Sequence, residues 1–428
     1  MARVAKELRR VAGFLAARLV DLKLKRLEDP RTRRGRRWSL EVIVRTVVVG
    51  LCAGCQSVAE IEDLTERMSG PMRRKLGIRR RLPDTTLRDV LVRLHPYDVR
   101  QALRQSIYAS WRRGALAPDD LPFGVLALDG KFTSLPVWDH HYSQMRTHDE
   151  GKKADGLVGT VTACLISTPA KPIIEAFPMT AATNEMGFFP HVIESLVHNY
   201  NGLFQLVTYD AGVPSADNCQ YVVDVGKDFF FRVKNENWHV YKEAGRLLGN
   251  KPVEEALDMT EDVLSNKKSV FRAVFAVKAP QVSWVWKPIK SLIRVNVRTV
   301  ENGVRTHEEN KYYISSLAPD RLTGAQWLRI SRGHWNVENN GHWTLDAIFR
   351  EDERPWIPTD PRGTVVVMLL RRIAYTMMAL FRGVTLRSEG KRITPWKKLM
   401  AWVHDTLIAI TAEQLDELRP RKELPAFP

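Results

Sequence analysis

Two aspartates follow short apolar runs that read as buried strands. Asp129 comes directly after the run 125–128, and Asp210 comes directly after the run 206–209. Active sites of open sheets lie beyond the carboxyl ends of buried strands, which is where both carboxylates are expected. Taken singly, each aspartate could instead cap the turn after its strand. On strands of one sheet, the two carboxylates could lie within reach of the same metal ion.

A third acid, Glu338, belongs to a polar stripe on a predicted helix. His334, Glu338, His342 and Asp346 recur every four residues, so they share one face of that helix. If the helix packs on the sheet, Glu338 completes a three-carboxylate site of the kind that holds Mg²⁺ or Mn²⁺. With two ions, such a site activates a water or hydroxyl group and stabilises the leaving oxygen of a phosphoryl transfer.

Rival chemistries have weaker support. A zinc helix of the H-E-x-x-H kind needs closer histidines than His334 and His342, which are eight apart and have no cysteine nearby. Cys52 and Cys55 form a lone C-x-x-C in an apolar stretch, so they are predicted to be buried core cysteines. The sequence has no G-x-S-x-G, Walker or G-x-G-x-x-G motif, which argues against serine hydrolases, P-loop NTPases and dinucleotide enzymes.

The elements that must position these residues read as a mixed α/β core. Predicted strands are 123–128, 157–167, 173–178, 203–209 and 229–233, and predicted helices are 184–200 and 214–225. Such a mixture is typical of a sheet flanked by helices. Residues 251–320 hold strand-length runs and the turn signal Glu301-Asn302-Gly303, so we expect a β-rich insertion. Helical periodicity returns at 323–350, 363–382 and 395–418.

Residues 1–118 are predicted to form a helical and strongly basic region. Helical periodicity runs through 4–27, 40–54, 57–68, 84–94 and 97–113. The stretch 40–54 is apolar nearly all round and should be a buried helix. Pro83 precedes a helix start that Asp84 or Thr85 could cap.

The charge of the chain indicates a polyanionic partner. Its 65 Lys and Arg outnumber its 49 Asp and Glu, which gives a formal net charge of +16. Basic residues crowd into two clusters: Arg31, Arg33, Arg34, Arg36 and Arg37, then Arg73, Arg74, Lys75, Arg79, Arg80 and Arg81. Such clusters neutralise backbone phosphates without reading base sequence, so we expect double-stranded DNA. The alternatives are a basic surface without a partner and, for 40–54, a packing or dimerisation layer.

Composition excludes several other classes of protein. A hydrophobic fraction of 44% in 428 residues supports a normal core, which argues against full disorder. Four cysteines are too few for a disulfide scaffold. No apolar run approaches the roughly 20 residues of a membrane span, and no secretory signal is evident. We therefore expect a cytoplasmic protein without a membrane partner, associated with the nucleoid when bound to DNA.

Four segments of the chain carry a family resemblance. They are Leu128-Asp129-Gly130-Lys131, the run 207–212, the run 332–352 and the run 82–87. The third opens with Arg332-Gly333-His334-Trp335-Asn336-Val337-Glu338-Asn339, which is long and specific. In order and spacing these segments resemble the motifs of bacterial insertion-sequence transposases of the DDE type, over roughly residues 40–380.

The resemblance implies a ribonuclease H-like mixed sheet with flanking helices, a helical N-terminal domain and a β-rich insertion before the glutamate. The implied divisions are an N-terminal domain at 1–118, a catalytic core at 119–250 and 321–428, and the insertion at 251–320. It also implies that Asp129, Asp210 and Glu338 hold two Mg²⁺ or Mn²⁺ ions. The implied reaction is cleavage of DNA at the ends of the element, followed by strand transfer into target DNA, by a homodimer.

The chain departs from this family around the glutamate. Many relatives carry Tyr, Arg and Lys at fixed positions around the glutamate. In this chain those positions are Ser331, His334 and Leu345. We interpret His334 as taking the catalytic role of that arginine. A lysine contact to DNA at position 345 is expected to be absent or supplied from elsewhere.

Further DNA contacts are expected from the motifs and from the insertion. Lys131 and Arg332 belong to the motifs and are counted with the DNA-binding residues. Trp284 and Trp286 are two apart, so on a strand both indoles face the same way. Relatives use an aromatic residue of the insertion to stack on an extruded base. The alternative is that both tryptophans form the core of a small β layer.

Two other functions stay open on sequence alone. One is a non-catalytic, domesticated DNA-binding protein derived from such an element, against which the three intact acids argue. The other is a nuclease of the same fold that does not transpose. Inverted repeats flanking the gene, with short target duplications outside them, would favour mobility.

Overall fold

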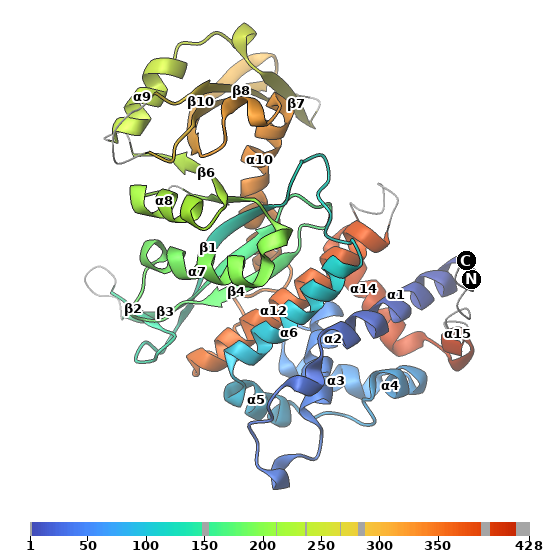
Figure 1. Cartoon of the computed structure of the whole chain (residues 1–428). Coiled ribbons are helices and arrows are strands. Elements are labelled where there is room, and N and C mark those ends of the chain that lie inside the picture. The colour runs from blue at the N-terminus through green and yellow to red at the C-terminus, as the bar shows by residue number, and fades with distance from the viewer. Residues whose placement is uncertain are drawn as a thin grey trace, which may run out of the picture.

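The computed structural model describes residues 2–147, 154–210, 212–235, 238–265, 267–280, 287–386 and 394–416. Figure 1 shows helices at one end, a mixed sheet in the middle and a β-rich lobe at the other end. The strands are β1 (Val125–Leu135), β2 (Gln144–Arg146), β3 (Asp155–Leu165), β4 (Ile173–Pro178), β5 (Leu206–Tyr209), β6 (Asp228–Val233), β7 (Asp258–Ser265), β8 (Lys268–Lys278), β9 (Ser291–Glu301) and β10 (Val304–Ser315).

The helices fall into three groups along the chain. The N-terminal group is α1 (Ala2–Asp21), α2 (Leu40–Cys52), α3 (Val58–Arg67), α4 (Gly70–Leu76), α5 (Asp84–Arg93) and α6 (Pro96–Arg112). The middle group is α7 (Glu185–Tyr200), α8 (Ala216–Asp224) and α9 (His239–Leu248). The last group is α10 (Gly324–Asn336), α11 (Trp343–Ala347), α12 (Pro361–Leu380), α14 (Trp396–Ala409) and α15 (Ala412–Asp416).

Three N-terminal helices begin at serines whose side chains accept a free backbone N–H group. Ser39, Ser57 and Ser69 cap α2, α3 and α4 in this way. Most of α2 is buried, as its apolar sequence predicts. The predicted side-chain cap of α5 is wrong, because the helix already includes Asp84 and no side chain caps it. Pro83 instead holds the chain extended before the first turn.

One sheet runs through the molecule in the order β2-β3-β1-β5-β6-β10-β9-β8-β7, with β4 also paired to β3. β3 is antiparallel to β1 and β4, whereas β5 is parallel to β1 and β6 is parallel to β5. Helices α7 and α8 supply the crossovers that lead into the two parallel strands. Three antiparallel strands followed by two parallel ones form the ribonuclease H-like order, so the predicted fold class is confirmed.

The β-rich segment extends this sheet and is not a separate layer. β10 pairs antiparallel with β6, and β9, β8 and β7 follow by antiparallel pairing. The β9–β10 hairpin turns at Asn302 and Gly303, whose φ angles are 53° and 79°, as its turn signal predicts. The sequence analysis did not predict β7 or α9. β7 is exposed along much of its length. The division of the chain into an N-terminal domain, a core in two segments and an insertion stays a prediction.

Helices cover both faces of the sheet. On one face, α10 lies over a cluster in which Trp327 of the helix meets Ala127, Leu206 and Phe230 of three strands. On the other face, α7 and α12 bury their apolar residues against the sheet. The acids expected at the strand ends therefore lie near helices on both sides.

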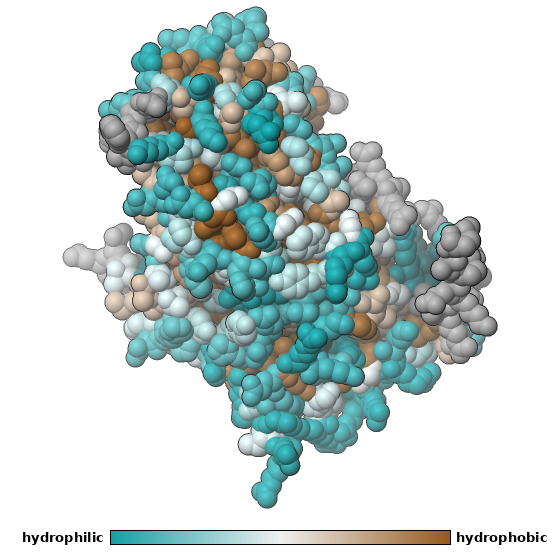
Figure 2. Space-filling view, in the orientation of Figure 1, coloured by the Kyte–Doolittle hydropathy of each residue, from teal (hydrophilic) through white to brown (hydrophobic). Residues whose placement is uncertain are grey.

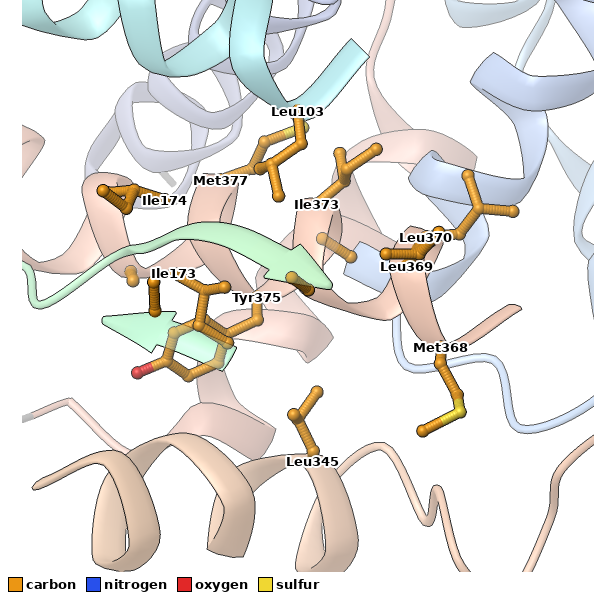
Figure 3. Packing of buried hydrophobic residues seen from close by; sticks show 14 of the residues in the cluster. Leu103, Ile173, Ile174, Leu345, Met368, Leu369, Leu370, Ile373, Tyr375 and Met377 are labelled. Carbon is orange, nitrogen blue, oxygen red and sulfur yellow. The ribbon is translucent and has the colours of Figure 1, made fainter. Parts of the chain in front are cut away.

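Helix α12 joins the N-terminal helices to the sheet. It packs against α2, α5 and α6 and against β3 and β4. In Figure 3, Met377 lies near Leu103 of α6, and Tyr375 lies near Ile173 of β4. The stretch Pro361–Thr385 is long and apolar enough to cross a membrane by length and composition alone, but its apolar window is 100% buried inside the protein. This burial identifies it as a core helix.

Candidate active site

Asp129 and Asp210 emerge from neighbouring strands at the same level of the sheet. β1 pairs with β5 only from Val125 to Ala127, and Ala127 lies opposite Thr208. Asp129 is two residues past Ala127, and Asp210 is two residues past Thr208. Both acids therefore lie just beyond the same end of this parallel ladder, and their role as metal ligands stays a prediction.

β1 is longer than its sequence predicts. Its antiparallel ladder with β3 continues to the pair Leu135 and Gly156. The prediction that the strand ends at Leu128 is wrong, and Asp129 lies inside β1, opposite Thr162. The apolar run stops at 128 because β1 is buried on both faces only up to Leu128, and beyond that point its buried residues largely alternate with less buried ones.

Each aspartate has a basic partner. Nδ1 of the buried His342 lies 3.2 Å from Oδ2 of Asp129, whose side chain is 26% exposed. Nζ of Lys234, which follows β6, donates to Oδ2 of Asp210 at 2.8 Å. Both carboxylates are held by a neighbour and remain partly open to solvent, as ligands of an exchangeable ion must be.

His334 reaches the site from α10. It is 7% exposed, and its Nδ1 lies 3.1 Å from Oγ1 of Thr208. Burial lowers the pKa of His334, and the negative charges of Asp129 and Asp210 oppose that shift. A neutral imidazole offers hydrogen bonds and lacks the fixed positive charge of arginine. The catalytic role of His334 stays a prediction.

Glu338 lies in a π-helical segment, Val337–His342, that links α10 to α11. This segment packs against β1, the strand that carries Asp129, and against β3. Short π segments are frequent at functional sites. The side chain of Glu338 lies outside the described part of the chain, and its role as a metal ligand stays a prediction.

The other members of the predicted polar stripe all reach the sheet. His334 contacts β5, His342 contacts Asp129, and Asp346 contacts Lys131 of β1. His334, His342 and Asp346 therefore lie on the side of this helical region that contacts the sheet.

Lys131 occupies a different place from the one predicted. It is 6% exposed, and its Nζ lies 2.6 Å from Asp346 and 3.0 Å from Asp352. Thr133 of the same strand donates to Asp352 at 2.8 Å. This geometry does not support a DNA contact for Lys131, because its charge is used to tie β1 to α11 and the loop after it.

The first basic cluster is only partly exposed. Arg31 is 4% exposed, donates to Asp29 at 2.9 and 3.0 Å, and donates to the carbonyl of Trp38 at 2.7 Å. The DNA contact predicted for Arg31 is therefore not supported, because the side chain holds its own loop together. The exposed members of the cluster are Arg33, Arg34, Arg36 and Arg37.

Arg37 and Arg80 bring the two basic clusters together at Trp38. Their guanidinium carbons lie 5.1 and 4.9 Å from the centre of the indole ring. A depression of about 670 Å³ beside them is lined by Arg79 and Gly77 as well. We call this region, with Arg33, Arg34 and Arg36, the Trp38 surface. The loop between α1 and α2 that carries it projects from the molecule (Figure 1), and its surface is hydrophilic (Figure 2).

The remaining predicted DNA contacts are distributed more widely. Arg74 and Lys75 are exposed on α4, whereas Arg73 is half-buried and donates to the carbonyl of Met68 at 2.9 Å. Arg332 is exposed on α10 and pairs with Asp262 of β7 at 2.8 Å. Trp284 and Trp286 lie outside the described residues, so their stacking role stays a prediction.

A fourth acid, which the sequence analysis passes over, lies beside the aspartates. Glu185 opens α7 after its Asn184 cap, and the hydroxyl of Tyr209 donates to its Oε2 at 3.4 Å. Burial raises the pKa of Glu185, and Asp129 and Asp210 raise it further. In the sequence Glu185 reads as an ordinary first-turn acid of a helix, and only the fold brings it to this edge.

The donors at this edge suit hard divalent cations. Carboxylate oxygens are the ligands that Mg²⁺ and Mn²⁺ prefer, and a zinc set of His and Cys is not assembled among the described residues. No group of three or more His, Cys, Asp or Glu in that part of the chain already surrounds one point. The acid expected to complete the set is Glu338. The four cysteines are buried and free, which confirms the prediction for Cys52 and Cys55.

Comparison with known proteins agrees with the motifs and the fold. A family model described as DDE_Tnp_1-associated matches residues 22–107, which include α2 to α5 and most of α6. Over 323 residues the chain is 23% identical to the H repeat-associated putative transposase YhhI of Escherichia coli (strain K12), covering 73% of this chain and 78% of that protein. The putative protein YbfL of the same organism matches this chain with the same identity and coverage. Together with the strand order, these matches support a DDE transposase.

One solved structure aligns with most of this chain. It is a piggyBac transposase in a synaptic complex with hairpin DNA. The alignment covers 99% of this chain and 82% of the piggyBac chain, with 12% sequence identity and a TM-score of 0.40. The fold assignment above rests on strand order and pairing and not on this match. DDE transposases in general move DNA and use divalent metal ions.

Proposed function

We propose that this transposase cleaves DNA at the ends of an insertion element and joins the freed 3′ end to target DNA. Asp129, Asp210 and Glu338 hold two Mg²⁺ or Mn²⁺ ions in this proposal. The observation that carries it is the register of β1 and β5, which brings the two aspartates together beneath the helix that bears the glutamate motif.

The residues around the aspartates have distinct tasks in this reaction. His342 holds Asp129 and Lys234 holds Asp210, so both carboxylates are oriented before DNA arrives. His334 lies behind them and, as a neutral imidazole, can accept or donate a hydrogen bond. The bound ions would activate water and then the 3′-hydroxyl as nucleophiles and would stabilise the leaving oxygen. No covalent link between protein and DNA is needed.

The partner of the N-terminal region is double-stranded DNA in this proposal. The Trp38 surface and the exposed Arg74 and Lys75 present positive charge that suits the phosphates of the element ends. Bringing two ends together requires two protomers, so we propose a homodimer on DNA. We place the protein in the cytoplasm, on the nucleoid when bound.

Cleavage of labelled element ends tests the proposal directly. Duplexes from the flanks of the gene are incubated with the full chain and Mg²⁺, and the products are separated on a denaturing gel. Nicks at the boundary of the inverted repeat support transposition, whereas cuts without regard to that boundary support a nuclease of the same fold. Binding without any cut, in Mg²⁺ or Mn²⁺, supports the domesticated DNA-binding protein.

A further inference from the structure

We propose that the cavity beside Trp38 binds a phosphate group of the DNA backbone, and that the Trp38 indole positions the arginines that hold this phosphate. The inference rests on the proposed function, because it takes DNA as the partner of the N-terminal region. It adds an uncharged residue to a surface that the sequence analysis defined by charge alone.

The cavity lies where two segments of the N-terminal region meet. One segment is the end of the loop before α2, which carries Trp38. The other follows α4, where Gly77 turns the chain by taking the left-handed conformation with a φ angle of 72°. Ile78 and Leu82 are buried on either side of the exposed run 79–81. The run is therefore anchored at both ends and presents its side chains to solvent.

Arginines whose charge no acid offsets converge on this cavity. Arg37, Arg79 and Arg80 line it, and no acidic residue does. None of the three forms a salt bridge with a residue that the structure describes, whereas Arg81 of the same run pairs with Glu62 at 2.7 Å. A phosphate group in the cavity would meet three guanidinium groups, whose planar forks match its oxygens. The chemistry of the cavity therefore suits a backbone phosphate.

The indole of Trp38 is the contact that the two segments share. The guanidinium carbons of Arg37 and Arg80 lie 5.1 and 4.9 Å from the centre of its ring. The backbone of Trp38 is fixed in turn, because the buried Arg31 donates to its carbonyl at 2.7 Å. Two arginines that are distant in sequence are thus held beside one rigid ring. Less side-chain entropy is then lost when they bind a phosphate.

The start of α2 lies at the same cavity. Ser39, whose side chain caps this helix, and Val42 both line it. The N-terminus of a helix carries a partial positive charge that attracts phosphate. Glu41 of the first turn pairs with Arg45 and is not part of the lining. The helix therefore adds to the attraction that the arginines exert on an anion.

Another explanation is that Trp38 only fastens its loop to the N-terminal helices. In that case, loss of the indole lowers the melting temperature but leaves the salt dependence of DNA binding unchanged. The slope of log affinity against log salt concentration reports the number of phosphates that the protein neutralises. If Trp38 positions arginines on a phosphate, replacing this uncharged residue changes that slope. The two explanations therefore differ in a quantity that can be measured.

Fluorescence anisotropy of a labelled element-end duplex, measured with the full chain at several salt concentrations, separates them. The variants are Trp38→Leu, Trp38→Phe and Arg79→Ala. One control is Trp138→Leu, which removes a tryptophan that is 41% exposed after β1. The other is Arg246→Ala, which removes an arginine of α9 whose side chain is 66% exposed. The melting temperature of each variant shows whether it is folded in the assay.

Trp38→Leu should weaken duplex binding about tenfold and lower the slope by about one to two, although it removes no charge. Trp38→Phe should keep most of the affinity, because a phenyl ring still supports cation–π contacts. Arg79→Ala should lower the slope by about one, whereas both controls should bind like the wild type. In the Arg37→Ala/Arg80→Ala background, Trp38→Leu should have no further effect on binding, because it acts through those two arginines.

An unchanged slope in Trp38→Leu, or a further loss of affinity in the background that lacks both arginines, overturns the positioning role of Trp38. An unchanged slope in Arg79→Ala overturns the phosphate site, whether or not Trp38→Leu folds. The proposed function survives either result if the wild type still cleaves element ends. A wild-type protein that binds no duplex at low salt overturns both the inference and the proposed function.

Discussion

Replacing Glu351 with Gln should destabilise the protein strongly, although no residue of the proposed active site is removed. Both side chains of the Glu351–Arg372 pair are 0% exposed, and Nη1 of Arg372 donates to the two carboxylate oxygens at 2.9 and 2.6 Å. Nη2 of Arg372 donates to Thr160 of β3 at 3.0 Å. The pair thus ties the end of the glutamate motif to α12 and to the sheet.

The magnitude follows from the charge that remains. Burial lowers the pKa of the neighbouring Arg371 to about 10, and Glu351 opposes that shift. Glu351 is therefore the counter-charge for two buried guanidinium groups. Removing one partner of a buried pair costs about 3–5 kcal/mol, because the other charge is left uncompensated. At about 2 °C per kcal/mol for a large domain, the melting temperature should fall by about 6–10 °C.

The assay is thermal unfolding followed by circular dichroism, with Glu353→Gln as the matched control. Glu353 pairs with Arg350, and the two side chains are 61% and 37% exposed, so its loss should change the melting temperature little. If Glu351→Gln melts within about 1 °C of Glu353→Gln, the buried pair does not hold the motif in place and the reasoning fails.

Three further predictions concern the site and the DNA. Arg37→Ala and Arg80→Ala should each weaken the binding of all duplexes alike. Each should also reduce by about one the slope of log affinity against log salt concentration, measured by fluorescence anisotropy. An unchanged slope would show that the Trp38 surface does not contact DNA. His342→Ala should slow cleavage about tenfold or more with DNA affinity kept, because Asp129 loses its partner; unchanged cleavage would contradict that role. Because the folded-state pKa of His334 is lowered, the unfolded chain binds a proton at a higher pH than the folded one. The free energy of unfolding should therefore fall as pH drops below about 6.5. His334→Gln should lose that part of the pH dependence. Urea unfolding at a series of pH values measures both.

The sequence predicts those parts of the fold that depend on local patterns. The buried helix at 40–54 and the hairpin at Asn302 and Gly303 follow from apolar periodicity and turn chemistry, and both are present. The continuation of β1 past Leu128 depends on its pairing with β3, which no local pattern encodes. The joining of β10 to β6 is a long-range contact of the same kind.

The candidate site shows the same limit. Asp129 and Asp210 could be found because each follows an apolar run, and their meeting follows from strand register. Glu185 could not, because an acid in the first turn of a helix is common and its approach to Gly130 is tertiary. The charge pattern also misleads at Lys131 and Arg31, since a basic residue in a motif or cluster can be buried on an acidic partner.

The most direct test of the central claim is cleavage of element-end DNA by the aspartate variants. Wild-type protein with Mg²⁺ should nick the labelled end, while Asp129→Asn and Asp210→Asn should each lose at least about 10³-fold in rate, because loss of one member disables a catalytic unit. Their affinity for the same duplex should remain close to that of the wild type. Cleavage by Asp129→Asn at the wild-type rate would contradict the account.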